Sequence, residues 1–70
     1  MSDVAAKRNH LMRAHAILSR SDIDLRLVQE HCLEGGMALG ETFELRRAID
    51  LVSKTLKAVE DEAAGLEEQA

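Results

Sequence analysis

The sequence predicts an all-α fold, in which short helices are followed by one long heptad-patterned helix that forms a helical hairpin or bundle. The 70-residue chain contains no proline and only four glycines, so helices can run almost uninterrupted. Three of those glycines, Gly35, Gly36 and Gly40, fall within six residues and mark one place where the chain reverses. The last third of the chain repeats its apolar residues at helical spacing. We therefore treat residues 1–70 as one helical domain.

A first helix is expected over about residues 3–19. Leu11, Ala14 and Leu18 share one side of it, and Val4 lies one heptad before Leu11. Much of the remaining surface is basic, from Lys7, Arg8, Arg13 and Arg20. This helix is amphipathic with a basic outer face.

A second helix is expected over about residues 22–34. Ser21 followed by Asp24 resembles a capping box at its start, and the Gly35–Gly36 pair is typical of a helix end. Apolar and polar residues alternate over 22–28, which is the period of a strand. Helix is the better interpretation, because Asp is a poor strand former and no second strand is present to pair with it.

A glycine-rich turn over residues 35–41 then leads into a long helix over about 42–64, with Thr42 as a candidate cap. The stretch GGMALGET lacks the spacing of a phosphate-binding loop, so we interpret Gly35, Gly36 and Gly40 as structural. The tail over 65–70, GLEEQA, is expected to fray.

The long helix carries a heptad seam with spacings of four and three, the pattern by which two helices pack knobs into holes. The seam consists of Leu45, Ile49, Val52, Leu56, Val59, Ala63 and Leu66. A second, narrower stripe consists of Ala48, Leu51, Thr55 and Ala58. Seventy residues supply little core for a monomer, so we expect a homodimer whose long helices pair through the seam. A single broad core face in a monomeric bundle is the alternative, and the sequence leaves open whether the dimer is parallel or antiparallel.

The charge distribution argues against nucleic acid as the partner. The formal net charge is −4, and duplex binders need an excess of Lys and Arg to contact phosphates. A helix-turn-helix can be drawn across the glycine turn, yet its reading segment ETFELRR begins with acidic residues. One phenylalanine is the whole aromatic content, too little for stacking bases. A nucleic-acid-binding helical dimer remains the alternative function.

The sequence contains no catalytic or metal-binding signature. His10 and His15 are five residues apart and turn to different sides of a helix, unlike the four-apart pair of a zinc helix. His31 and Cys32 are adjacent and also diverge, and a lone Cys32 is typical of a small buried apolar residue. We therefore expect no enzyme activity, no metal and no cofactor.

The expected function is to bind another protein. The candidate contact residues are Arg8, Arg13, Arg46 and Arg47. The acidic stretch EDEAAGLEE is either a solvated helix end or a docking patch for a basic partner. Neither an export signal nor a membrane-spanning run is present, which predicts a cytoplasmic protein.

A basic first helix, the break CLEGG and a long dimerising helix in about seventy residues resemble the anti-quorum-sensing anti-activators of transposable Pseudomonas phages. That resemblance implies a regulator that binds and inhibits a host transcription activator, and in that family also a pilus assembly ATPase. It is one of architecture and assigns no functional positions. A plasmid copy-number helical hairpin protein is similar in size and dimeric shape.

Overall fold

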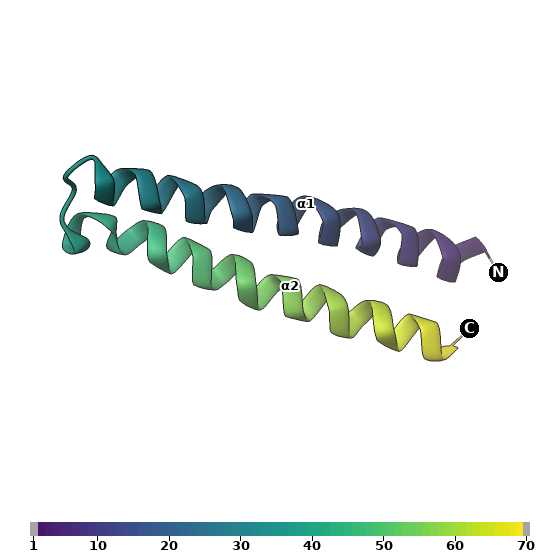
Figure 1. The fold of residues 1–70 in the computed structure, drawn as a ribbon. Helices are drawn as coiled ribbons and strands as arrows, with labels where there is room; N and C mark the ends of the chain where they lie inside the picture. The colour runs from purple at the N-terminus through teal and green to yellow at the C-terminus, as the bar shows by residue number, and fades with distance from the viewer. Residues whose placement is uncertain (1, 70) are drawn as a thin grey trace.

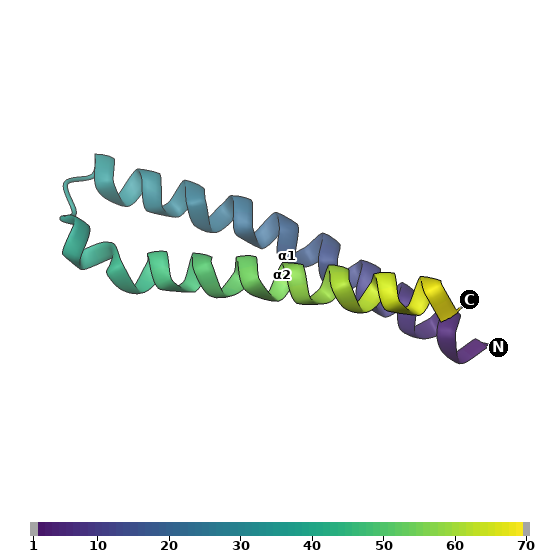
Figure 2. The same cartoon turned by 90° about the horizontal axis from the view of Figure 1, so that it is seen from below.

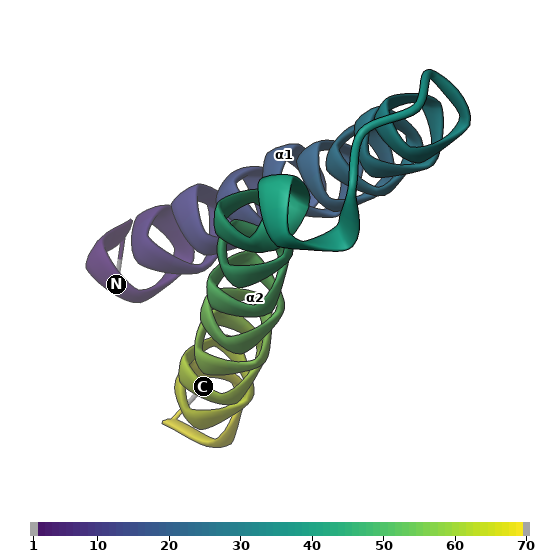
Figure 3. The same cartoon turned by 90° about the vertical axis from the view of Figure 1, so that its left-hand side faces the viewer.

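The protein is a helical hairpin, as the sequence predicted. The computed structural model describes residues 2–69, in which α1 (Ser2–Glu34) is followed by the 3₁₀ helix η1 (Leu39–Thr42) and by α2 (Phe43–Gln69). The two long helices are antiparallel, and the described ends of the chain lie together at the end opposite the turn (Figure 1). Viewed from the turn end, the helices cross at an inclination (Figure 3).

α1 is one continuous helix, so the expected break between residues 19 and 22 is wrong. Ser21 and Asp24 lie inside the helix, and no new helix begins at either residue. Two ion pairs span the region, and each joins residues four positions apart: Arg20–Asp24 at 3.8 Å and Arg26–Asp22 at 3.0 Å. Ion pairs of this spacing support a helix. The helical interpretation of residues 22–28 is confirmed.

The turn at Gly35 and Gly36 is confirmed and is a Schellman motif. The Gly36 N–H donates to the Leu33 carbonyl at 3.1 Å, and the Met37 N–H donates to the Cys32 carbonyl at 3.0 Å. Gly36 has a φ of 97°, in the left-handed region that favours glycine. This position is what stops α1.

Residues 39–42 form η1, where the sequence predicted an irregular turn up to residue 41. The Glu41 carboxylate accepts a hydrogen bond from the Ala38 N–H at 2.9 Å, which holds the start of η1. Thr42 does not cap α2, which begins at Phe43. Its hydroxyl donates to the Leu39 carbonyl at 3.0 Å, and its side chain is 2% exposed.

α2 extends further than predicted. It runs to Gln69 rather than stopping near residue 64, and Gly65 lies within it. The frayed tail expected over 65–70 is therefore wrong up to Gln69, and Ala70 lies outside the described residues. Because no proline or left-handed glycine follows Gly36 in the described chain, nothing ends the helix earlier.

The heptad seam of α2 packs against α1 of the same chain, and this corrects the predicted pairing of two long helices. All seven seam residues are buried or half-buried, with Ile49 and Leu66 the least exposed at 5% and 9%. α1 presents a matching row with a seven-residue repeat, which sequence reasoning had only partly recognised. This row consists of Val4, Leu11, Leu18, Leu25 and Cys32. A second copy would therefore have to meet a different face.

The hairpin is long and thin. Its principal extents are 53 × 14 × 12 Å and its radius of gyration is 16.0 Å, against about 11 Å for a compact domain of this length. Figure 2 shows the two helices overlapping near the described termini, where Figure 1 shows them apart, so the helices are inclined to one another. A single interface between two helices provides the core, so large apolar side chains remain on the outside. These are Met12, Ile17, Ile23, Leu27, Val28, Met37, Leu39, Phe43 and Leu51.

Candidate interaction surfaces

The interface between the helices has two lateral edges, and one of them, here called the polar side, is crossed by two side-chain bridges. His15 Nε2 lies 3.0 Å from Glu60 Oε1, and Arg26 Nη2 donates to Ser53 Oγ at 3.5 Å. The polar side consists of Met12, His15, Arg26, Gln29, Arg46, Asp50, Ser53, Glu60, Ala64 and Glu67. It contains two open hollows, one toward each end of the hairpin.

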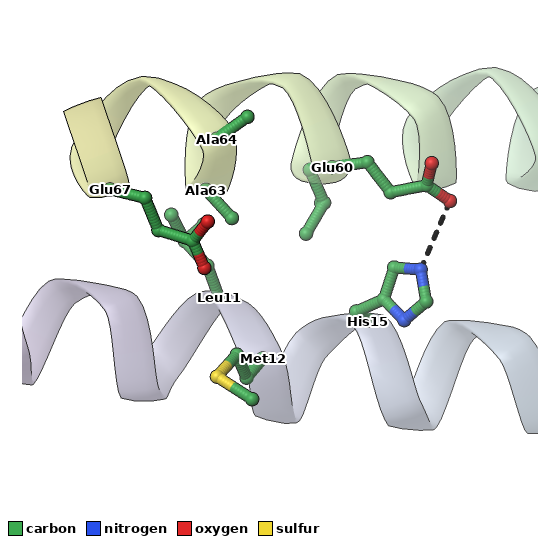
Figure 4. Close-up of a pocket in the computed structure, with 8 residues that line it drawn as sticks. Leu11, Met12, His15, Glu60, Ala63, Ala64 and Glu67 are labelled. Atoms are coloured by element: carbon green, nitrogen blue, oxygen red, sulfur yellow. Dashed lines mark hydrogen bonds and ion pairs between the residues drawn. The ribbon is translucent and has the colours of Figure 1, made fainter.

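The hollow near the described termini has an apolar floor and an acidic rim. Leu11 from α1 and Ala63 from α2 lie between the helices, and Glu60 and Glu67 lie on the α2 edge (Figure 4). Its volume is about 270 Å³. His15 Nε2 already contacts the Glu60 carboxylate at 3.0 Å. Both side chains nevertheless stay substantially exposed, at 41% and 60%. An exposed pair of this kind contributes little to binding or stability.

The hollow near the turn is lined by two arginines. Its volume is about 460 Å³, and Arg26, Arg46 and Leu39 lie around it. Arg26 is engaged, because its Nε donates to Asp22 Oδ2 at 3.0 Å. Arg46 makes no ion pair with any residue in the described range, so its charge is open to an acidic group from outside.

The structure does not bring the four predicted contact arginines together. Arg8 and Arg13 lie in the first part of α1, near the described termini, whereas Arg46 and Arg47 lie in the first turns of α2, at the other end of a 53 Å molecule. Arg46 and Arg47 share a small hollow with Phe43. Only this second pair is accompanied by exposed apolar side chains from the turn.

The opposite edge of the interface, here called the neutral side, differs in composition. At the end near the described termini it begins at a hollow lined by Lys7, His10 and Glu62. From His10 and from Glu62, residues spaced three, four or seven apart continue toward the turn on the same edge. Those between the charged end near the termini and Glu44 near the turn are Ala14, Ile17, Ser21, Asp24, Val28, Ala48, Leu51, Thr55 and Ala58. The α2 members form the second stripe predicted from the sequence.

The remaining candidate groups are dispersed. His10 and His31 are exposed, and Cys32 is a half-buried free thiol on the inner face of α1. No group of three His, Cys, Asp or Glu within the described chain is arranged to hold a metal ion. Neither helix, over its described length, is both long and apolar enough to cross a lipid bilayer.

Comparison with known protein families, with curated proteins and with solved structures found no match. Sequence reasoning had missed the His15–Glu60 bridge, the Asp22–Arg26–Ser53 contacts and the concentration of apolar residues at the turn. The His15–Glu60 and Arg26–Ser53 contacts join residues that are 45 and 27 positions apart, so no local pattern points to them. The third was visible in the sequence as Met37, Leu39 and Phe43, but their spacing does not show whether turn residues face the core or the solvent.

Proposed function

We propose that this chain is a small, cytoplasmic, non-enzymatic regulator that binds another protein through the turn end of the hairpin and inhibits it by sequestration. The observation that carries the proposal is the composition of that end. Phe43, Leu39 and Met37 are 57%, 63% and 39% exposed. Phe43 shares a hollow with Arg46 and Arg47, and Leu39 shares another with Arg46. Aromatic residues, Met and Arg are the residue types enriched where proteins bind one another.

The contacts at this end also indicate the chemistry of the partner. Arg46 lies at the polar-side hollow together with Leu39, and no acidic residue of the described chain pairs with it. An apolar side chain of the partner can enter beside Leu39 and Phe43 while a carboxylate reaches Arg46 in two-point geometry. The partner site is therefore an apolar pocket or groove with an acidic edge.

The elongated shape supports a role in blocking a surface. A thin hairpin can lay one end on its target while its length covers neighbouring surface. The resemblance to phage anti-activators points the same way and makes a transcription activator our proposed target. Arg8 and Arg13, at the far end, are a second contact for a partner that spans the full 53 Å.

The test begins with the tagged full chain incubated in bacterial lysate, followed by mass spectrometry of retained proteins. A retained candidate is then purified and titrated with the chain by calorimetry. We expect a defined stoichiometry, loss of the partner's activity, and affinity that falls tenfold or more for Phe43→Ala and for Arg46→Glu. Hot-spot truncations cost at least about 1.4 kcal/mol, which corresponds to tenfold.

Lys54→Glu is the matched control, because it reverses one exposed charge of α2 away from the turn. It should leave the affinity within about twofold, since a distant rim charge contributes little. If Lys54→Glu and Arg46→Glu weaken binding equally, the turn end is not the site. Retention of nucleic acid that falls steeply with salt, in place of a protein, would favour the alternative function.

A further inference from the structure

We propose that the neutral side is the surface on which a second copy of this chain packs, so that two hairpins form a four-helix bundle. The interface would be made by the row of Ala14, Ile17, Ser21 and Val28 on α1 and the row of Ala48, Leu51, Thr55 and Ala58 on α2. The seam of α2 stays within each chain. This inference does not depend on the proposed function, because it concerns a face remote from the turn-end residues.

The charges select this side over the polar side. Between its charged ends, the neutral side carries one ionisable side chain, Asp24, which pairs with Arg20 on α1 at 3.8 Å. The polar side carries Arg26, Arg46, Asp50 and Glu60 near its middle and ends. Burying those groups against a second copy would remove their hydration, which costs several kcal/mol per uncompensated ion, whereas interface centres are typically depleted of charge.

The surface area supports a second copy as the occupant. The chain exposes 5443 Å², whereas a compact monomer of 7.7 kDa exposes about 4,300 Å². The excess is about 1,100 Å², and a dimer of standard size buries about 600–1,000 Å² on each partner. One interface of ordinary size therefore brings the hairpin back to the surface expected for its mass.

The side chains on the neutral side suit close helix packing. Ile17, Val28 and Leu51 are 67%, 47% and 56% exposed and project as knobs. The alanines, serine and threonine between them are small, so they leave holes that such knobs can fill from a partner. Both hairpins would then complete a core that each one lacks alone.

The charged ends determine the orientation of the two copies. If both turns lie at the same end, each α1 row packs on the partner's α2 row. Lys7, at the start of the α1 row, then meets Glu62 at the end of the partner's α2 row. If the turns lie at opposite ends, the two α2 rows pack together and Glu44 approaches a second Glu62, which is repulsive. We infer that the turns lie at the same end, and that Ser21 and Thr55 face each other across the interface.

Sedimentation equilibrium of the full chain tests the proposal. We expect twice the chain mass of 7.7 kDa at micromolar concentration. Leu51→Lys should weaken the dimer at least tenfold, and Ile23→Lys should not. The two side chains are matched in exposure, at 56% and 57%, but Ile23 lies away from the neutral side. A mass of 7.7 kDa for the native chain, or equal effects of the two variants, would overturn the proposal.

A second measurement needs no substitution, so it stands even if a variant fails to fold. The melting temperature of the native chain should rise over a hundredfold increase in concentration, because association stabilises the folded state by mass action. An unchanged melting temperature would contradict a dimer coupled to folding. A chain that dimerises but binds no other protein leaves this inference intact and removes the proposed function.

Disulfide cross-linking tests the orientation, in a Cys32→Ala background that removes the native thiol. We expect a mixture of Ser21→Cys chains and Thr55→Cys chains to form the mixed disulfide. Efficient cross-linking of Thr55→Cys chains to one another would place the turns at opposite ends and overturn this arrangement.

Discussion

The inner faces of α1 and α2 meet along the same interface but are built differently. The α2 face is apolar at all seven seam positions from Leu45 to Leu66. The α1 face has an apolar row too, but beside it stand His15, Asp22 and Gln29, each half-buried. The difference shows that the α2 seam contributes apolar contacts alone, whereas the α1 face combines apolar contacts with polar ones.

The polar contacts of α1 are concentrated halfway along the hairpin. Asp22 is 19% exposed in its side chain, and its Oδ2 accepts the 3.0 Å hydrogen bond from Arg26. Its Oδ1 is buried without a hydrogen-bond partner in the described structure. Arg26 extends onward to Ser53 of α2. A buried polar group of this kind costs stability, and it is best attested as a means of fixing register between helices.

Ile49→Ala is the change that should break the apolar face of α2 most strongly. Ile49 is 5% exposed in the seam, so truncation loses buried apolar surface and leaves a cavity. We expect the free energy of unfolding to fall by about 3 kcal/mol. Urea denaturation followed by circular dichroism measures it, at one fixed chain concentration.

Ile23→Ala on α1 is the control for that measurement. Ile23 is 57% exposed, and Ala is the better helix former, so the change should stay within about 0.5 kcal/mol. If the two substitutions cost the same, the seam does not pack on α1 as described.

The difference between the two inner faces also explains what sequence reasoning achieved. The unbroken seam from Leu45 to Leu66 predicted a long helix and its inner face correctly. In α1 the apolar residues at Ile23 and Leu27 are exposed, while Asp22 lies inward. The apparent capping pair of Ser21 and Asp24 and the alternation over 22–28 therefore suggested a break that the tertiary contacts do not require.

The partner of the seam could not be predicted from its pattern. A heptad repeat indicates that a helix packs on another helix. The spacing of the apolar residues is the same whether that second helix belongs to the same chain or to another chain. The deciding information was the continuity of α1, which gives it the length to cover all of α2. The turn was predictable because Gly36 requires a left-handed φ, and η1 was not, because its key contact is a single Glu41 side chain.

Asp22→Leu should make the inner face of α1 resemble that of α2. It removes a buried carboxylate oxygen that lacks a partner and adds apolar contact along the row, while Arg26, 59% exposed, returns to water. We expect the free energy of unfolding to rise by about 1 kcal/mol. The same denaturation experiment detects it.

Asp24→Leu is the matched control, because its side chain is 60% exposed and its contact with Arg20 is longer, at 3.8 Å. It should change the stability by less than about 0.5 kcal/mol. A loss of stability in Asp22→Leu would show that the carboxylate contributes more than its burial costs. A gain in stability with new oligomer sizes would support a role in register.

Gly65→Ala should strengthen the end of α2, the one helix of the pair with an internal glycine. A Cβ at this position meets nothing within 4 Å, and its φ is helical, so alanine fits without strain. The expected gain in stability is about 0.8 kcal/mol. Gly36→Ala is the contrasting variant, because its φ of 97° makes alanine destabilising there.

The smallest effect concerns the bridge between the polar part of the α1 face and the edge of α2. His15 and Glu60 lie 3.0 Å apart, but with side chains 41% and 60% exposed their attraction is screened by water. A double-mutant cycle with His15→Gln and Glu60→Gln should give a coupling energy below about 0.5 kcal/mol. A coupling that exceeds this bound and persists in high salt would mean that the bridge is desolvated in solution. In that case the polar side, rather than the neutral side, is covered, because only the exclusion of water by another surface would strengthen an ion pair placed at that edge.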